Sequence, residues 1–104
     1  MNSTAKEIAE KLRDVLRDNF SDFNGLYLFG SQAKGTATSD SDIDIVVLMK
    51  TWNWKETGYF YKVISRFRYE NDVDLELLPM TYDELERNPF FYNEVVNKGI
   101  FYVV

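Results

Sequence analysis

Two short apolar runs, separated by a polar stretch that begins at a glycine, set the strongest limit on how this chain can fold. Leu26–Phe29 is an apolar run of the kind expected for a buried strand, and Ile43–Leu48 is rich in β-branched residues. Residues 30–41 between them are small or polar and show no apolar period. We therefore predict two strands joined by a loop that starts at Gly30.

Helical periods precede and follow this pair of strands. Apolar spacing predicts an amphipathic helix over Thr4–Asn19, and Thr4 with Glu7 has the form of a capping box. Asn24-Gly25 predicts an ordinary turn after it. Residues 52–55 read as a connection, and the spacing of Phe60, Val63, Ile64 and Phe67 predicts a second helix.

The last third of the chain predicts one more strand, two helices and a short end strand. Acidic and apolar residues alternate over residues 72–78 before Pro79, which is the period of a strand with one polar face. Thr81 with Glu84 forms a second capping box. The remaining signals are Asn88-Pro89 at a helix start, Gly99 at its end after Lys98, and a strand within residues 100–104.

The length of 104 residues and the absence of a repeat or linker predict one domain over residues 1–104. Strands that alternate with helices predict an α/β (α+β) fold, with a mixed sheet of about three to four strands flanked by helices. Exposed aromatic side chains are also expected, because Tyr59–Tyr61 and Phe90–Tyr92 exceed what one small core easily hides.

Composition limits the chemistry that is available. The net charge is −5, which disfavours direct nucleic-acid binding. The chain has no His and no Cys, so imidazole bases, thiol nucleophiles and the usual zinc ligands are excluded, and any metal must bind oxygen. No apolar run is long enough to span a bilayer and no signal peptide is evident, so the expected location is cytoplasmic, without a membrane partner.

Asp42 and Asp44 are the strongest candidates for chemistry. They are two residues apart at a strand start, so both side chains leave one face while Ile43 points to the core. Neighbouring carboxylates repel one another, and Mg²⁺ is the natural counterion. Gly30, directly after a strand, would let backbone amides and the Ser31 hydroxyl approach a phosphate, although a plain tight turn remains the alternative.

Asp74 could complete a three-acid cluster if its strand lies next to that of Asp42 and Asp44. The alternative is that Asp72, Asp74 and Glu76 form the solvated face of an edge strand. Two other motifs do not fit. Gly30 to Gly35 has phosphate-loop spacing, but Thr36-Ala37 stands where Lys and Ser or Thr should follow. An EF-hand loop is excluded because Ile45 occupies its glycine position.

The run GSQAKGTATSDSDIDIVV resembles the G-S-x-A-x-G-x-x-x-x-x-S-D-x-D signature of the DNA polymerase beta nucleotidyltransferase superfamily. The short chain is most similar to the minimal nucleotidyltransferases (MNT proteins) of that superfamily. The resemblance implies that Gly30 and Ser31, with Lys34 and Gly35 in the same turn, bind the nucleotide. It also implies that Asp42 and Asp44 ligate two Mg²⁺ ions, with Asp74 as third carboxylate. Gln32 stands where such proteins often carry Arg.

The same resemblance implies a function. MNT proteins are commonly antitoxins of two-component systems whose partner is an all-helical HEPN ribonuclease toxin, and they can transfer AMP from ATP to a tyrosine of the toxin. We therefore expect a Mg²⁺-dependent protein adenylyltransferase. The alternatives are a binding module that occludes its partner, and an enzyme whose acceptor is RNA or a small molecule. Trp52 and Trp54 could contact a base or a partner, although packing is the plainer role.

Overall fold

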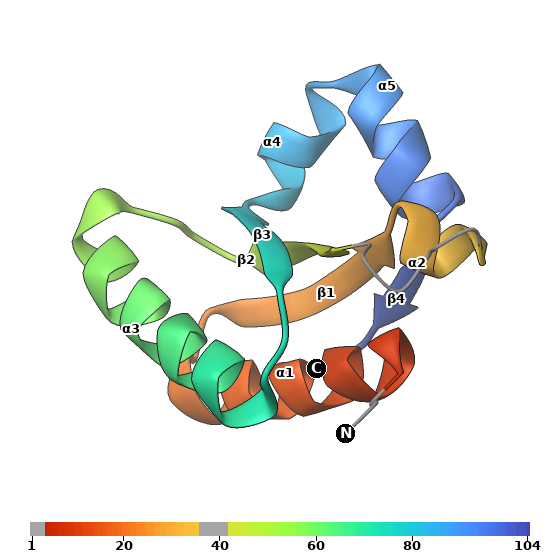
Figure 1. The fold of residues 1–104 in the computed structure, drawn as a ribbon. Coiled ribbons are helices and arrows are strands. Elements are labelled where there is room, and N and C mark those ends of the chain that lie inside the picture. Colours follow the sequence, from red (N-terminus) through yellow and green to blue (C-terminus); the bar gives the residue numbers. More distant parts are fainter. Residues whose placement is uncertain (1–3, 36–41) are drawn as a thin grey trace.

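The computed structural model describes residues 4–35 and 42–104, without the side chain of Trp54. Its centre is a four-stranded sheet in the order β3-β2-β1-β4, in which β1 pairs antiparallel with β2 and β4, and β2 pairs parallel with β3 (Figure 1). The elements, in chain order, are α1 (Ala5–Asn19), β1 (Phe23–Phe29), α2 (Ser31–Lys34), β2 (Ile43–Met49), α3 (Trp54–Asn71), β3 (Leu75–Met80), α4 (Tyr82–Glu86), α5 (Pro89–Tyr92), the π-helix η1 (Asn93–Asn97) and β4 (Ile100–Tyr102). The predicted mixed α/β architecture is confirmed.

Helices α1 and α3 cover one face of the sheet (Figure 1). Their apolar sides pack on the side chains of β2 that point the same way, and the main core forms there. Ile45, Leu12 and Phe60 are completely buried in it. The predicted capping box closes the start of α1, since the Thr4 hydroxyl accepts a hydrogen bond from the Glu7 amide at 3.1 Å.

A second, smaller core lies on the opposite face, where α4, α5 and η1 pack on the sheet (Figure 1). Its buried members are Val46 and Leu48 of β2, Leu85 of α4 and Val95 of η1. Strand β2 therefore alternates between two cores along most of its length, which explains why its sequence is almost continuously apolar.

Two local predictions are wrong. Gly25 does not form an ordinary turn: it lies inside β1, at φ +109°, where the register with β2 shifts between Phe23 and Leu26. The ring of Phe101 packs directly on it, so a side chain at this position would overlap that ring. The stretch after Gly30 is not all loop, because Ser31–Lys34 form the single helical turn α2.

Smaller differences concern boundaries. Helix α3 begins at Trp54, inside the predicted connection, and Asn53 caps it. Strand β3 begins at Leu75 rather than at Asp72, which is the left-handed residue (φ 48°) that ends α3. The helix predicted before Gly99 is present, but its second half is a π-helix. No helix in the part of the chain that the structure describes is long and apolar enough to cross a membrane.

Candidate functional site

The start of β2 carries two carboxylates on one face of the sheet. Ile43 and Ile45 are buried in the main core, so Asp42 and Asp44 face the opposite side. Asp44 is half-buried and Asp42 is exposed. The face predicted from the two-residue spacing is therefore the face on which both acids lie.

Gly30 lies against Asp44. Strand β1 ends opposite this acid, since Phe29 is paired with Asp44 across the antiparallel ladder. The chain then turns at Gly30, with φ +74° and ψ −154°, and α2 begins at Ser31. A Cβ atom on Gly30 would overlap Oδ2 of Asp44. The glycine is thus required both by its backbone conformation and by the closeness of the carboxylate.

The surroundings of Asp44 disfavour its charge. Burial raises the pKa of Asp44, and the neighbouring charges of Glu76 and Asp42 raise it further. A carboxylate in this position gains from any cation that approaches it. This electrostatic setting is the one that the sequence predicts for paired acids at the edge of a core.

Strand β3 brings two more acids to the same face. The parallel register pairs Asp44 with Glu76, and the amide of Ile43 donates a hydrogen bond to the carbonyl of Asp74 at 3.2 Å. Asp74 precedes the strand, and both Asp74 and Glu76 have exposed side chains. From the sequence, Asp74 is proposed for the acid cluster, and Glu76 is named only in the alternative, as part of a solvated strand face. The signal for Glu76 was the acidic-apolar alternation itself, which puts Asp74 and Glu76 on one face.

The acids fit a magnesium ion that is bound together with a nucleotide. Within residues 4–35 and 42–104, no three carboxylates gather closely enough to hold a metal ion by themselves. Mg²⁺ usually binds through one or two carboxylates plus substrate phosphates rather than in an all-protein cage. Asp42 and Asp44, whose repulsion a cation would relieve, provide that kind of half-site.

The other predicted nucleotide-binding residues lie on or next to α2. Its last residue, Lys34, forms an ion pair with Glu94 of η1, with Nζ and Oε2 3.1 Å apart. Gly35 ends the helical turn in the left-handed conformation, at φ +75°. Residues 36–41, which complete the signature, lie outside the described residues.

The comparisons with known proteins agree with this arrangement. The family model described as "Polymerase beta, Nucleotidyltransferase" matches residues 10–101. The chain belongs to this family. The resemblance found in its sequence, including that to the MNT proteins, is thereby confirmed.

This nucleotidyltransferase is similar to named proteins and to chains of solved structures. It is 29% identical, over 91% of each chain, to a protein of Methanocaldococcus jannaschii named "Putative protein adenylyltransferase MJ0141". Two crystal structures of a toxin-antitoxin contain a similar chain, each covering 89% of this chain and 70% of the other. One, a mutant of the MntA-HpeT pair, is 26% identical with a TM-score of 0.65, and the other, with AMP-PNP, is 28% identical with a TM-score of 0.65.

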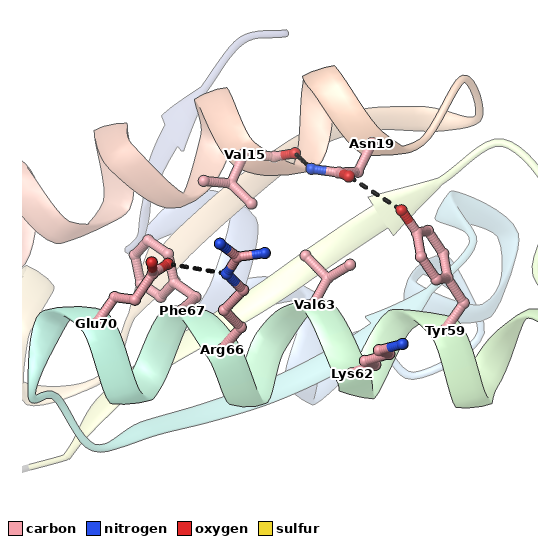
Figure 2. A pocket seen from close by; sticks show the side chains of 8 residues that line it. All are labelled: Val15, Asn19, Tyr59, Lys62, Val63, Arg66, Phe67 and Glu70. Carbon is pink, nitrogen blue, oxygen red and sulfur yellow. Dashed lines mark hydrogen bonds and ion pairs between the residues drawn. The ribbon is translucent and has the colours of Figure 1, made fainter.

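A separate groove lies on the far side of this nucleotidyltransferase sheet. It has a volume of about 440 Å³ and runs between α1 and α3, over Val15, Val63 and Phe67 (Figure 2). Tyr59 closes one end, where its hydroxyl donates a hydrogen bond to Asn19 at 3.0 Å (Figure 2). The acids of β2 point to the opposite face, so this groove is separate from the candidate site.

The aromatic residues divide between core and surface. Phe60 is completely buried and Trp52 packs edge-on against it, so packing accounts for Trp52. The side chain of Trp54 lies outside the described part. Tyr59, Tyr61 and Phe90 are exposed, whereas Phe91 and Tyr92 are partly buried against the second core. Part of this aromatic group is therefore exposed, as the sequence predicts.

Proposed function

We propose that this nucleotidyltransferase transfers AMP from ATP to a tyrosine hydroxyl of a HEPN ribonuclease toxin, and that it acts in this way as a cytoplasmic antitoxin. The observation that carries the proposal is the contact between Gly30 and the half-buried Asp44. It places a turn without a side chain, which a phosphate could approach closely, beside a carboxylate whose charge a cation would stabilise.

In the proposed site, Gly30 and Ser31 hold the triphosphate, while Asp42 and Asp44 hold Mg²⁺. The metal, when bound, would offset charge on the α-phosphate and on the departing pyrophosphate. The acceptor oxygen forms a bond to the α-phosphorus as the bond from that phosphorus to the β-phosphate oxygen breaks. Asp74 orients the hydroxyl and accepts its proton, so that AMP-tyrosine and pyrophosphate are the products.

The acceptor is proposed from the relatives. One relative carries the name of a protein adenylyltransferase, and similar chains occur in toxin-antitoxin crystal structures, one of them with the ATP analogue AMP-PNP. A toxin held in complex with this chain would present its tyrosine as the acceptor. The net charge of −5 favours a protein acceptor over an RNA end.

The test uses purified components. A purified HEPN ribonuclease toxin is incubated with this protein, ATP and Mg²⁺, and its intact mass is measured. We expect the mass to rise by whole AMP units with the wild type, and to stay unchanged when Asp42→Asn and Asp44→Asn are combined. The double variant should be at least as stable as the wild type without metal, because a repulsion is removed.

A toxin whose mass stays unchanged with the wild-type protein, but whose ribonuclease activity is still inhibited in the complex, would contradict AMP transfer and favour an occluding module. Undiminished transfer by the double variant would contradict the assignment of the two acids.

A further inference from the structure

The C-terminal helical segment brings a second lysine to the nucleotide turn. Glu94 of η1 binds two ammonium groups with its two carboxylate oxygens: Oε2 contacts Nζ of Lys34 at 3.1 Å, and Oε1 contacts Nζ of Lys98 at 3.0 Å. The three side chains are 44%, 25% and 49% exposed for Lys34, Glu94 and Lys98, so both ammonium groups can be reached from solvent. Within the described residues, these two positive charges share the one negative charge of Glu94.

The cluster of Lys34, Glu94 and Lys98 lies next to Gly30. Lys34 is one helical turn from the glycine, and its amide donates a hydrogen bond to the carbonyl of Gly30 at 3.1 Å. Lys98 approaches from η1. Because Leu28 pairs with Ile100 in the antiparallel ladder, the residues just before β4 lie beside the end of β1. A Cβ on Gly99 would lie 2.8 Å from the carbonyl oxygen of Leu28. Figure 1 shows α2 beside the end of this helical segment.

The π-helical turn aligns Glu94 with Lys98. Residues Asn93–Asn97 form η1, and Lys98 follows directly. A π turn takes more residues than an α turn, so side chains four apart come closer to lying one above the other. Such turns are rare and frequently occur at functional sites. An exposed ion pair contributes little to stability, so stability alone is a weak reason for keeping this arrangement.

We propose that Lys98, held beside Lys34 by Glu94, is a second cationic contact for the β- and γ-phosphates of the bound nucleotide. The proposal rests on the nucleotidyltransferase function proposed above and names a binding residue for the same site. The turn Gly30–Lys34 supplies one cation, Lys34, and Gln32 supplies none. A triphosphate carries several negative charges. Lys98, which directly follows η1, would supply a second positive charge to bind them.

The experiment compares nucleotides that differ only in their terminal phosphates. Calorimetry measures the binding of ATP and of AMP, each with Mg²⁺, to the full chain. Lys98→Met should weaken ATP binding about tenfold, the order expected for the loss of one charge-assisted hydrogen bond, and should change AMP binding less than twofold. Lys98→Arg should restore most of the ATP affinity. Lys62→Met, which removes an exposed lysine from α3 on the far face, is the matched control and should leave both affinities unchanged.

Two results would overturn the inference: wild-type ATP affinity in Lys98→Met, or an equal loss for ATP and AMP, which would indicate a general structural effect. Circular dichroism melting of both variants checks that the fold is kept. A failure of the proposed function would give a different result from a failure of this inference. A wild-type protein that binds ATP with this dependence on Lys98, yet transfers no AMP, would leave the phosphate contact standing and contradict the enzyme.

Discussion

Gly30 has no side chain, and this lets the end of β1 lie directly against Asp44 of β2. Gly30 adopts φ +74° and ψ −154°, a combination that only glycine reaches without strain, and it touches the carboxylate of Asp44. Asp44 is half-buried and has acidic neighbours, so its charge is costly in the free protein and is stabilised once a cation binds. These two residues give the first two predictions.

Gly30→Ala should be damaging in two ways. Its backbone strain costs about 1–3 kcal/mol, and the new methyl group must displace Asp44. We expect a lower unfolding midpoint in urea and a loss of ATP binding in calorimetry. Gly58→Ala is the control, because Gly58 lies within α3 facing open space, where alanine gains up to about 1 kcal/mol. Wild-type ATP binding in Gly30→Ala would contradict the close approach.

Asp44→Asn should stabilise the metal-free protein at neutral pH. The folded state raises the pKa of Asp44, so the folded protein holds this proton more strongly than the unfolded chain, and stability falls as the pH rises through the folded-state pKa. The advantage of asparagine should therefore disappear below the ordinary carboxyl pKa of about 3.9. Melting temperatures of both proteins at about pH 3 and pH 7 measure this. A gain that is the same at both pH values would contradict the electrostatic cause.

At the level of elements, alternate residues of β2 and β3 point to the same face, so their acids lie together there. The second core holds α4, α5 and η1 over that same face. Leu85 is completely buried there with Val46, Leu48 and Val95. Because η1 carries Glu94, the packing of this core also determines where the lysine pair lies.

Leu85→Ala should destabilise the protein by about 2–5 kcal/mol, since a buried leucine leaves a cavity. Leu78→Ala is the matched control: Leu78 is 38% exposed on β3, and its loss should cost much less. Chemical unfolding of the two variants gives the comparison. Equal losses would mean that the second core does not hold α4 in place.

Most elements could be predicted from the sequence because their signals are local. Capping boxes at Thr4 and Thr81 and the two-residue period of β2 are read directly from neighbouring residues. The errors come from contacts distant in sequence. Gly25 lies within a strand, where the ring of the distant Phe101 packs on it, and α2 is too short to show an apolar period. Likewise, Glu76 acts on Asp44 only through the register of two strands.

On the scale of the whole molecule, the sheet separates two kinds of surface. Helices α1 and α3 close one face (Figure 1). The acids of β2 and the lysine pair held by Glu94 lie on the other face. In the proposed function, a partner toxin presents its tyrosine to the face that carries these acids. We propose that the toxin is inhibited by AMP transfer to its tyrosine rather than by binding alone.

The most direct test measures the intact mass of the toxin that co-purifies with Asp74→Asn from cells expressing both proteins. Asparagine keeps the size of the side chain and removes its charge, so binding should survive while AMP transfer falls by orders of magnitude. Asp72→Asn is the control, because Asp72 is an exposed, left-handed residue at which asparagine fits equally well. We expect the toxin to be unmodified, and the cells to be no longer protected from it, with Asp74→Asn but not with Asp72→Asn. Full protection by Asp74→Asn, with an unmodified toxin, would contradict this proposal.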